Sequence, residues 1–396
     1  MSELSYLEKL LDGVEVEWRN LGDTSLFEIA NNGRKPVKAS LRIAGETPYY
    51  GANNIQDYVD GYTHDGEYVL IAEDGSASLE NYSIQYATGK FWANNHVHVV
   101  RGKERVHSRF LYHYLCIVNF LPFLTGGGRA KLTKGQLIEI PVPIPCPGNP
   151  EKSLAIQSEI VRILDKFSAL TAELTAELNM RKKQYNYYRD QLLSFDEEQE
   201  KPIYLEKLLD GVEVEWLPLS DLARIRNGKD HKSLSEGEFP VYGSGGIMRY
   251  VDTYAYNKPS VLIPRKGSLG NLFFIDVPFW TVDTIFYTEI DEAQIRPKYL
   301  YYFLSTVGLG EMNQAGGVPS QTQSVLNKLK IPIPCPDNPE KSLAIQSEIV
   351  RILDKFDTLT NSITEGLPRE IELRQKQYEY YRDLLFSFPK PETASN

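Results

Sequence analysis

Two stretches of the chain carry apolar residues at alternating spacings of three and four positions, the pattern of helices that pair along their length. The first stretch runs through Ile156, Ile160, Ile163, Phe167, Leu170 and Leu174, and the second through Ile345, Ile349, Ile352, Phe356, Leu359 and Ile363. Asn149 and Asn338 precede them as N-caps, each followed by a proline that suits the first helical turn. The pattern predicts two long helices paired along these seams. The alternative is two amphipathic helices that each serve the core of a separate domain.

An internal duplication surrounds both helices. Pro150–Phe167 returns unchanged as Pro339–Phe356, and Tyr6–Trp18 returns unchanged as Tyr204–Trp216. The shorter repeat ends in Val-Glu-Val-Glu-Trp, which alternates as a short strand does. Two identical helical surfaces in one chain are well suited to each other, and this favours the paired arrangement.

Short landmarks recur in the same order in the two differing segments between these repeats. Tyr50-Gly51 is matched by Tyr242-Gly243, and the apolar runs 68–72 and 260–264 both lead into polar loops that contain glycine. Apolar runs of this length bounded by turn residues predict buried strands. We therefore expect two domains of one fold.

The resulting fold class is α+β, present twice, together with a pair of long helices. The expected divisions are residues 1–18 for the N-terminal part of the repeat, 19–148 for the first domain, 149–200 for the first helix and a linker, 201–216 for the second copy of the short repeat, 217–337 for the second domain, 338–388 for the second helix and 389–396 for a frayed tail.

The two predicted helices differ in the number of residues between a matching phenylalanine and a matching tyrosine. Seventeen residues separate Phe167 from Tyr185, including a tandem Thr-Ala-Glu-Leu over residues 171–178, whereas twenty-one separate Phe356 from Tyr378. Four extra residues predict a second helix longer by about one turn, or ~6 Å. Gly366 and Pro368 in that helix predict a kink or break.

Charge is unevenly distributed along the chain. The net charge is -10, yet residues 19–150 carry 13 Lys+Arg against 12 Asp+Glu, and residues 217–336 carry 12 against 11. The acidity lies in the repeats, so the net charge does not exclude DNA as a partner of the domains. We find no apolar run near the ~18 residues of a membrane span and expect no membrane association. Three scattered cysteines predict neither a disulfide framework nor a zinc site, and fit a reducing cytoplasm.

The sequence offers no chemistry of its own. It contains neither a glycine-rich nucleotide-binding motif nor an Asn/Asp-Pro-Pro-Tyr/Phe methyltransferase signature. His96 and His98 form its close histidine pair, and strand alternation would place both on one face; without a third ligand, no metal site is predicted. The chain is therefore expected to be non-catalytic and to bind no cofactor.

The duplicated arrangement, the Ile-Pro-Ile-Pro-Cys-Pro segments before the helices and the tandem Thr-Ala-Glu-Leu resemble the specificity subunits of type I restriction–modification systems, in particular the type IC branch. The resemblance covers essentially the whole chain. It implies two target recognition domains, each reading one half of a split site in double-stranded DNA. It also implies that the helices form a pseudo-twofold antiparallel coiled coil.

The resemblance further implies partners. Two modification subunits would dock on the helices and methylate adenine with S-adenosylmethionine, and motor–nuclease restriction subunits would cleave DNA with ATP and Mg²⁺. The complex would be cytoplasmic. Two alternatives remain open: a stand-alone nuclease or methyltransferase, and an adaptor that binds only protein.

Candidate DNA contacts lie in matched polar turns, where backbone N–H groups can approach phosphates and side chains can approach base edges. Arg265 and Lys266 suit guanine, whereas Glu73 and Asp74 at the matched positions suit cytosine. Ordinary hairpin turns and salt-bridged loops are the alternatives. The candidates are Tyr50, Gly51, Asn53, Asn54, Glu73, Asp74, Ser76, Lys131 and Lys134 in the first domain, and Tyr242, Gly243, Ser244, Gly245, Arg265, Lys266, Ser268, Gln321, Thr322 and Gln323 in the second. Tyrosines near the helix ends (185, 187, 188, 378, 380 and 381) are expected to pack against a partner or the helix pair.

Overall fold

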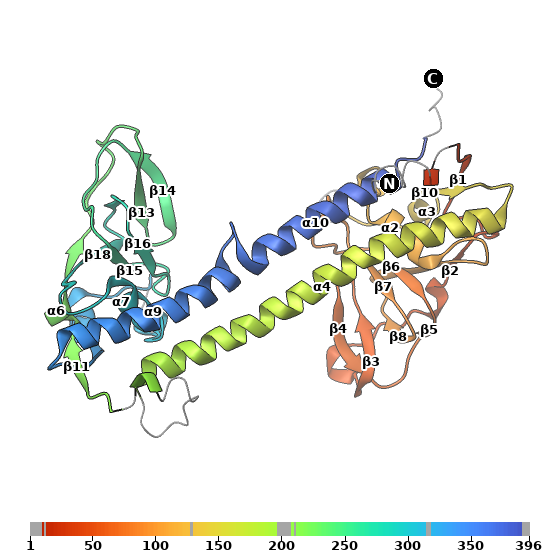
Figure 1. The fold of residues 1–396 in the computed structure, drawn as a ribbon. Coiled ribbons are helices and arrows are strands. Elements are labelled where there is room, and N and C mark those ends of the chain that lie inside the picture. The colour runs from red at the N-terminus through yellow and green to blue at the C-terminus, as the bar shows by residue number, and fades with distance from the viewer. Residues whose placement is uncertain are drawn as a thin grey trace. The chain divides into compact units, whose positions relative to one another are not determined.

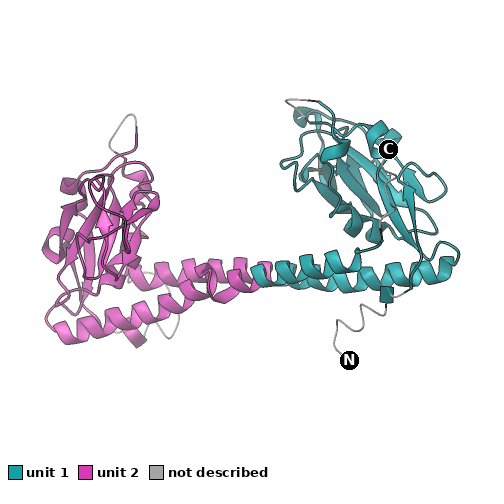
Figure 2. Ribbon diagram, turned by 90° about the horizontal axis from the view of Figure 1, so that it is seen from above, with its two compact units in different colours: residues 1–173, 371–396 teal, residues 174–370 magenta. Residues whose placement is uncertain are grey.

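The computed structural model describes residues 10–11, 13–126, 130–195, 207–209, 211–313 and 318–389. The chain divides into two compact units, which Figure 2 shows in different colours. Unit 1 comprises residues 1–173 and 371–396, and unit 2 comprises residues 174–370. Two helices, α4 (Pro150–Ser194) and α10 (Gly366–Leu385), contribute to both units.

Unit 1 contains two four-stranded sheets, ordered β2-β9-β6-β7 and β4-β3-β8-β5, and a two-stranded ladder, β1-β10 (Figure 1). Its elements are β1 (Val16–Asn20), β2 (Phe27–Ile29), η1 (Asn31–Gly33), η2 (Ala39–Leu41), β3 (Ala44–Tyr50), β4 (Ile55–Val59), β5 (His64–Asp65), β6 (Tyr68–Ala72), β7 (Ile84–Ala87), β8 (Lys90–Ala93), β9 (Val97–Gly102), α2 (Ser108–Leu115), η3 (Leu121–Phe123), α3 (Lys134–Leu137), β10 (Pro141–Pro145) and the first part of α4.

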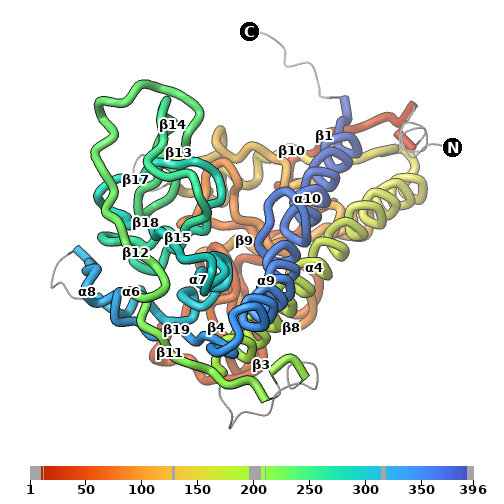
Figure 3. The backbone as a smooth tube through the Cα atoms, turned by 60° about the vertical axis from the view of Figure 1, so that its left-hand side comes forward, coloured from red at the N-terminus to blue at the C-terminus, as the bar shows by residue number. Residues whose placement is uncertain are grey.

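Unit 2 repeats this plan with sheets ordered β12-β18-β15-β16 and β14-β13-β17 and a ladder β11-β19. Figure 3 shows β13, β14 and β17 grouped above β12, β15 and β18. The elements are β11 (Val214–Pro218), α6 (Leu219–Leu222), β12 (Ala223–Asn227), β13 (Phe239–Gly243), β14 (Gly246–Val251), β15 (Ser260–Pro264), β16 (Phe273–Ile275), β17 (Trp280–Thr281), β18 (Ile285–Ile290), α7 (Pro297–Leu304), η4 (Leu309–Glu311), α8 (Gln323–Leu326), β19 (Lys330–Pro334) and α9 (Pro339–Asn361).

The predicted apolar runs form β6 and β15, and every residue of both strands is buried. Strands covered on both faces show continuous apolar runs, which explains why their alternation is lost. Both domains of this α+β fold therefore have the same buried strand, and each strand ends at the polar loop that follows it.

The short repeat and the proline-rich segment pair with each other at the start of each long helix. Trp18 lies opposite Pro143, and Trp216 lies opposite Pro332, in antiparallel ladders. The chain then turns at Cys146 or Cys335, each of which has a backbone conformation in the left-handed region. The asparagine three positions later caps the helix, since Asn149 Oδ1 and Asn338 Oδ1 each accept a hydrogen bond from a backbone N–H at 3.0 Å. The predicted N-caps are thus confirmed.

The identical first turns of α4 and α9 pack against their own domains. Ile156 and Ile160 are buried in the core of unit 1, and Ile345 and Ile349 are buried in the core of unit 2. Each core also contains residues of the other helical segment, such as Leu385 in unit 1 and Leu192 in unit 2, so these four residues lie where a domain core meets the helix pair. An a/d spacing describes one apolar face, and that face serves a domain core as well as a partner helix.

A buried glutamine anchors each of these helical starts. Gln157 accepts from the His107 backbone N–H at 2.9 Å and donates to the Arg105 carbonyl oxygen at 3.1 Å. Gln346 makes the same contacts, at 2.8 Å from the Arg296 N–H and 3.1 Å to the Gln294 carbonyl oxygen. The repeated glutamine therefore docks on a matched loop in each domain.

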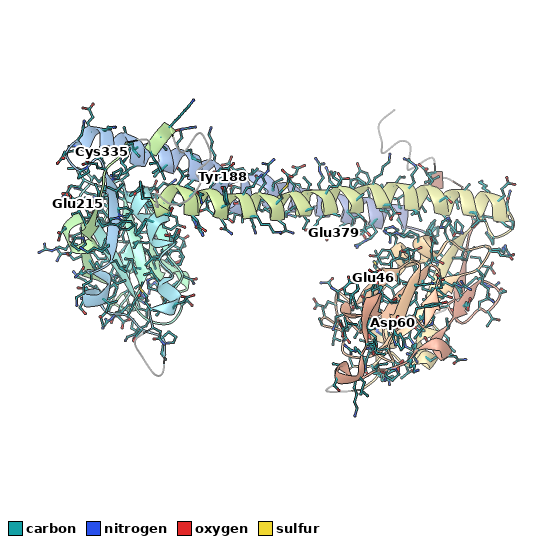
Figure 4. All side chains as sticks on the ribbon, turned by 90° about the horizontal axis from the view of Figure 1, so that it is seen from below. Glu46, Asp60, Tyr188, Glu215, Cys335 and Glu379 are labelled. Carbon is teal, nitrogen blue, oxygen red and sulfur yellow. The ribbon has the colours of Figure 1, made fainter. Side chains whose placement is uncertain are left out.

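The later turns pair the helices with each other. Phe167 on α4 stacks on Tyr381 of α10 within unit 1, with ring centroids 5.1 Å apart. Tyr188 on α4, labelled in Figure 4, stacks on Phe356 of α9 within unit 2 at 5.4 Å. An early residue of α4 thus meets a late residue of the second helical segment, and a late residue meets an early one. The helices therefore run antiparallel, as expected for the coiled coil.

The second helical segment is interrupted. Residues 362–365 separate α9 from α10, which confirms the predicted break (Figure 1). Ile363, assigned to the seam, lies in this loop with 80% of its surface exposed. The assignment of Ile363 to the seam is wrong, because the four extra residues form a loop outside the helices. The prediction that they lengthen the second helix by one turn is wrong for the same reason. Ile163, Ile352, Leu359 and Leu174 are half-buried, and Leu170 is 36% exposed.

Residues at the end of each long helical segment complete a domain core. Leu385, Phe386 and Phe388 are buried in unit 1, and Leu192 and Leu193 are buried in unit 2. In unit 1 the contact continues to Pro389, whose carbonyl oxygen accepts from Trp18 Nε1 at 2.8 Å. The rest of the predicted tail, residues 196–200 of the predicted linker and parts of both short repeats (residues 6–9, 12, 204–206 and 210) lie outside the described residues.

Candidate nucleic-acid interface

Several of the predicted loops meet at one edge of the first domain, the loop edge of domain 1. It consists of the β3–β4 turn (residues 51–54), the loop after β6 (73–83), the β8–β9 turn (94–96) and the segment at Lys131. The Asn53 side chain links two of these loops, because it donates to the Gly75 carbonyl oxygen at 2.8 Å and accepts from the Ala77 N–H at 2.8 Å. An isolated bridge joins Asp74 to Lys131.

Glu73 is held within this edge by cations. Arg34 Nη1 lies 2.6 Å from its carboxylate, and Lys131 Nζ lies 3.0 Å away, with the Glu73 side chain 16% exposed. Asp74 Oδ1 lies 2.5 Å from His96 Nδ1. The alternative of a salt-bridged loop therefore describes the contacts that both acids make within the domain.

Burial and ion pairing set the protonation of this cluster. Burial acts to raise the pKa of Glu73, but hydrogen bonds from Arg34 and Lys131 outweigh it, and the pKa is lowered. Burial lowers the pKa of His98, which keeps its ring neutral. His98 Nε2 lies 2.7 Å from the Leu132 carbonyl oxygen and therefore carries the proton, while Nδ1 accepts from Asn31.

His96 and His98 do not share a strand face as predicted, because His96 lies in the turn before β9 and contacts Asp74. Within the described ranges no group of three or more potential ligands is arranged to hold a metal ion. Nor is any described helix long and apolar enough to cross a membrane.

The second domain has a loop edge built in the same way, from the β13–β14 turn (244–245), the loop after β15 (265–272) and the segment at Ser320. A bridge joins Lys266 to Ser320, as Asp74 is joined to Lys131. The Gln321 N–H donates to the Arg265 carbonyl oxygen at 3.0 Å, as the Leu132 N–H donates to the Glu73 carbonyl oxygen at 2.7 Å. The structure thus brings the matched loops together twice.

The charge at the matched positions differs between the domains. Arg265 lies over the Phe286 ring at 5.8 Å, and among the described residues no carboxylate pairs with its guanidinium. Lys266 has a distant neighbour, with Nζ 4.0 Å from Asp283 and both side chains largely exposed. The loop edge of domain 2 therefore offers cations to an anionic partner, whereas Glu73 in domain 1 is paired with two cations.

Some of the candidates make contacts within the domain. A Cβ at Gly51 would lie 2.0 Å from the Gln56 side chain, and one at Gly243 would lie 2.7 Å from Met248 Sδ, so a side chain at either position would have to displace the flexible end of a hairpin neighbour. Gln321 is 1% exposed, and its Nε2 donates to the Pro264 carbonyl oxygen. Tyr242 is 9% exposed, and Tyr50 stands edge-on to Phe91 at 5.9 Å. Ser76 Oγ accepts from the Ser83 N–H at 3.0 Å within its own loop.

The other candidates are half-buried or exposed. Gln323 is half-buried and donates to Asn227 at 3.2 Å, and Ser244 is half-buried too. The exposed candidates are Asn53, Asn54, Lys131 and Lys134 in the first domain and Gly245, Lys266, Ser268 and Thr322 in the second. Sequence reasoning missed Arg34, because nothing local links it to a carboxylate 39 positions away.

The helix tyrosines separate into two groups. Tyr188 and Tyr381 stack within the helix pair, whereas Tyr187 and Tyr380 are 50% and 55% exposed. Each exposed ring stands edge-on to its neighbour at 5.4 Å, with interplanar angles of 72° and 73°. The same aromatic surface therefore occurs once in each unit.

The chain contains two domains of one fold, each with a matched loop edge and a copy of the same helical segment. Together these features define a duplicated recognition scaffold. Residues 14–181 and 211–373 match the profile of the type I restriction modification DNA specificity domain, so the chain belongs to this family, as its sequence suggested.

Its relatives cover nearly the whole chain. It is 47% identical to a Haemophilus influenzae protein assigned as a type I restriction enzyme specificity subunit, over 97% of this chain and 98% of that one. It is 39% identical to the Escherichia coli EcoR124I/EcoR124II specificity subunit over all of both chains. A crystal structure of a type I S subunit from M. genitalium shares the fold, with a TM-score of 0.66 and 19% identity, over 96% of this chain and 98% of that one.

Proposed function

We propose that this chain recognises a split site in double-stranded DNA, with the loop edge of each domain on one half-site. The observation that carries the proposal is the recurrence of the same loop edge in both domains, with no carboxylate paired with Arg265 of the second among the described residues. Arginine can donate two hydrogen bonds to guanine O6 and N7, and lysine can pair with phosphate or guanine. The different charges at positions 73 and 265 support different half-site sequences.

Arg265 is the residue we assign to base recognition in domain 2. One well-placed arginine–guanine contact discriminates by about 1–3 kcal/mol. Arg265→Ala in the assembled complex should therefore relax one position of one half-site and leave the other half-site intact. Methylome sequencing of cells carrying the complete system reads both halves at once.

Arg224→Ala is the matched control. Arg224 is an exposed arginine of the same domain on β12, opposite Glu289 at the far end of the strand from the loop edge. Its loss should leave the methylated motif unchanged. If Arg265→Ala also left the motif unchanged, the assignment of the loop edge would be wrong.

The rival functions predict other results. A stand-alone nuclease or methyltransferase would turn over DNA with Mg²⁺ and S-adenosylmethionine but without a partner. An adaptor that binds only protein would leave the assembled complex unable to shift a split-site duplex. Specific binding that weakens steeply with salt, as release of counterions from phosphates requires, supports DNA recognition instead.

We also assign a partner surface to the helices, which we name the tyrosine patch. It consists of Lys183, Tyr187 and Asp190 on α4, and Lys376, Tyr380 and Asp383 on α10. Spacings of four and three place each trio on one helix face. Exposed tyrosines flanked by charges are typical anchors of protein interfaces. Two identical patches suit two copies of one partner, which are the modification subunits in this proposal.

Removing the anchors one at a time tests this assignment. Tyr187→Ala and Tyr380→Ala should each lose one partner copy, and the double variant should lose both, as measured by native mass spectrometry. Tyr62→Ala removes a tyrosine that is 51% exposed on the first domain and should leave assembly unchanged. Full assembly of the double variant would place the docking surface elsewhere.

Catalysis in this proposal comes from the partners. The modification subunits would supply S-adenosylmethionine-dependent adenine methylation, and motor–nuclease subunits would supply ATP- and Mg²⁺-dependent cleavage. The chain itself would position them on DNA in the cytoplasm.

A further inference from the structure

His96 occupies the β8–β9 turn at the loop edge of domain 1, and its ring has one nitrogen without a partner. Nδ1 lies 2.5 Å from Asp74 Oδ1, so the ring donates a hydrogen bond to the carboxylate. The His96 side chain is 42% exposed, and among the described residues no hydrogen-bond partner is found for Nε2. The ring therefore keeps Nε2 available for a ligand.

The Asp74 carboxylate fixes which ring nitrogen carries the proton. In a neutral imidazole one nitrogen donates and the other accepts. Because Nδ1 donates to Asp74, Nε2 is left as the acceptor. In the major groove of DNA the donors that such an acceptor can bind are the exocyclic amines, adenine N6 and cytosine N4.

The backbone of His96 is held from both sides. Its N–H donates to Asn94 Oδ1 at 2.8 Å, and its carbonyl oxygen accepts from the Glu73 N–H at 2.8 Å. Asn94 is 3% exposed, and Arg34 Nη1 donates to the Val97 carbonyl oxygen at 2.8 Å. The ion pair between Glu73 and Arg34 thus ties the turn to the loop after β6. A ring with a fixed polarity on a fixed backbone is preorganised for recognition.

Domain 2 carries a different group at this place. The Thr284 carbonyl oxygen accepts from the Arg265 N–H at 2.8 Å, as the His96 carbonyl oxygen accepts in domain 1. Thr284 and His96 therefore occupy matched positions. The Thr284 hydroxyl accepts from the Ser244 N–H at 3.3 Å and so serves its own domain. A ring nitrogen available to a ligand is thus a feature of domain 1 and not of the shared fold.

We propose that His96 Nε2 reads an exocyclic amine, adenine N6 or cytosine N4, in the half-site of domain 1, and that Asp74 is the positioning residue that sets the polarity of the ring. The proposal rests on the proposed function, because it requires the loop edge to lie on DNA. Guanine and thymine present only acceptors to hydrogen bonding on their major-groove edges. Either base at the contacted position would leave Nε2 unpaired and is therefore rejected.

Three substitutions separate base reading from structural support. His96→Asn keeps an amide N–H near the place of Nδ1, so the hydrogen bond to Asp74 can remain while the acceptor Nε2 is removed. Asp74→Asn replaces the carboxylate by a group that can also donate. His107→Asn is the control, because His107 is an exposed histidine of the same domain whose backbone N–H donates to Gln157 of α4.

Methylome sequencing of cells that carry the complete system reads the motif of each variant. His96→Asn should relax one adenine or cytosine position in one half-site and leave the other half-site intact. His107→Asn should leave the motif unchanged. Asp74→Asn should admit guanine at the position that His96→Asn relaxes, because an amide that donates to Nδ1 leaves the proton on Nε2. General weakening of the domain would instead lower methylation without admitting guanine.

Binding to modified duplexes tests the contact itself. The assembled complex is titrated with duplexes in which the exocyclic amine at the relaxed position is replaced by hydrogen. Loss of the amine should weaken binding of the natural complex by up to about tenfold. It should have no further effect on the His96→Asn complex, because the two changes remove the same hydrogen bond.

Two results would overturn the proposal. One is an unchanged motif in the His96→Asn system. The other needs no variant: amine-free analogues at every adenine and cytosine of the half-site that residues 19–141 determine leave binding of the natural complex unchanged. Failure of the natural system to methylate a split site would contradict the proposed function. An intact split site with an unchanged His96→Asn motif would contradict the assignment of His96 alone.

Discussion

Phe386 lies near the end of the sequence, yet it belongs to the core of the first domain. Its side chain is 6% exposed, with ring centroids 5.4 Å from Phe110 and 5.7 Å from Tyr114. Phe386→Ala should therefore destabilise unit 1 and leave unit 2 intact. The expected effect is confined to unit 1, although Phe386 lies 213 positions after residue 173, where the first part of unit 1 ends.

The magnitude follows from the burial of the ring. Truncation of a buried phenylalanine to alanine costs about 3–5 kcal/mol, which includes the lost transfer energy and the cavity left behind. For a unit of this size, each kcal/mol lowers the unfolding temperature by about 2–4 °C. We expect the transition of unit 1 to move down by roughly 10 °C.

Scanning calorimetry measures the shift in unfolding temperature. Hydrogen exchange then assigns the shift to a unit, because β6 and β9 report on unit 1 and β15 and β18 report on unit 2. Leu193→Ala is the mirror variant and should weaken β15 and β18 instead, because Leu193 is buried in unit 2. Ser387→Ala changes an exposed neighbour and is the control. Faster exchange in both units after Phe386→Ala, or in neither, would refute the assignment.

Two further predictions concern pH and modularity. Burial lowers the pKa of both His98 and His113, so the unfolded chain binds protons more readily than the folded one. The free energy of unfolding should be steady above the ordinary histidine pKa of about 6.5 and should decline as pH falls below it. Unfolding temperatures measured across that range test this. They would not change with pH if both rings were already charged in the folded chain. Exchange of residues 19–141 for the matching segment of another family member should change one half of the methylated site, and a change in both halves would contradict independent domains.

Local patterns predicted the elements that depend on neighbours in sequence. The buried strands β6 and β15 and the caps Asn149 and Asn338 follow from runs and spacings within a few residues. The break before Gly366 follows in the same way, because glycine and proline act on the backbone where they stand. The repeats then extended each local prediction to its second copy.

What the sequence could not predict depends on distant partners. An isoleucine at an a/d position packs equally well on a domain or on a helix, so the spacing alone did not show that Ile160 also belongs to the core of unit 1. Glu73 is neutralised by Arg34, and Gln321 is buried beneath Pro264, through contacts that no spacing in the sequence encodes. These three cases share one physical cause, since the energy of a side chain depends on what surrounds it in space.

The closure of unit 1 by residues from both ends of the chain has a consequence for biosynthesis. A ribosome releases the N-terminal domain first, but the aromatic cluster of that domain lacks Phe386 and Phe388 until all of unit 2 has been synthesised. Unit 2 is a single continuous segment, so all of its residues are available earlier. The domain that is translated first is therefore completed last, and its unfilled apolar surface must be protected from aggregation throughout the synthesis of the second.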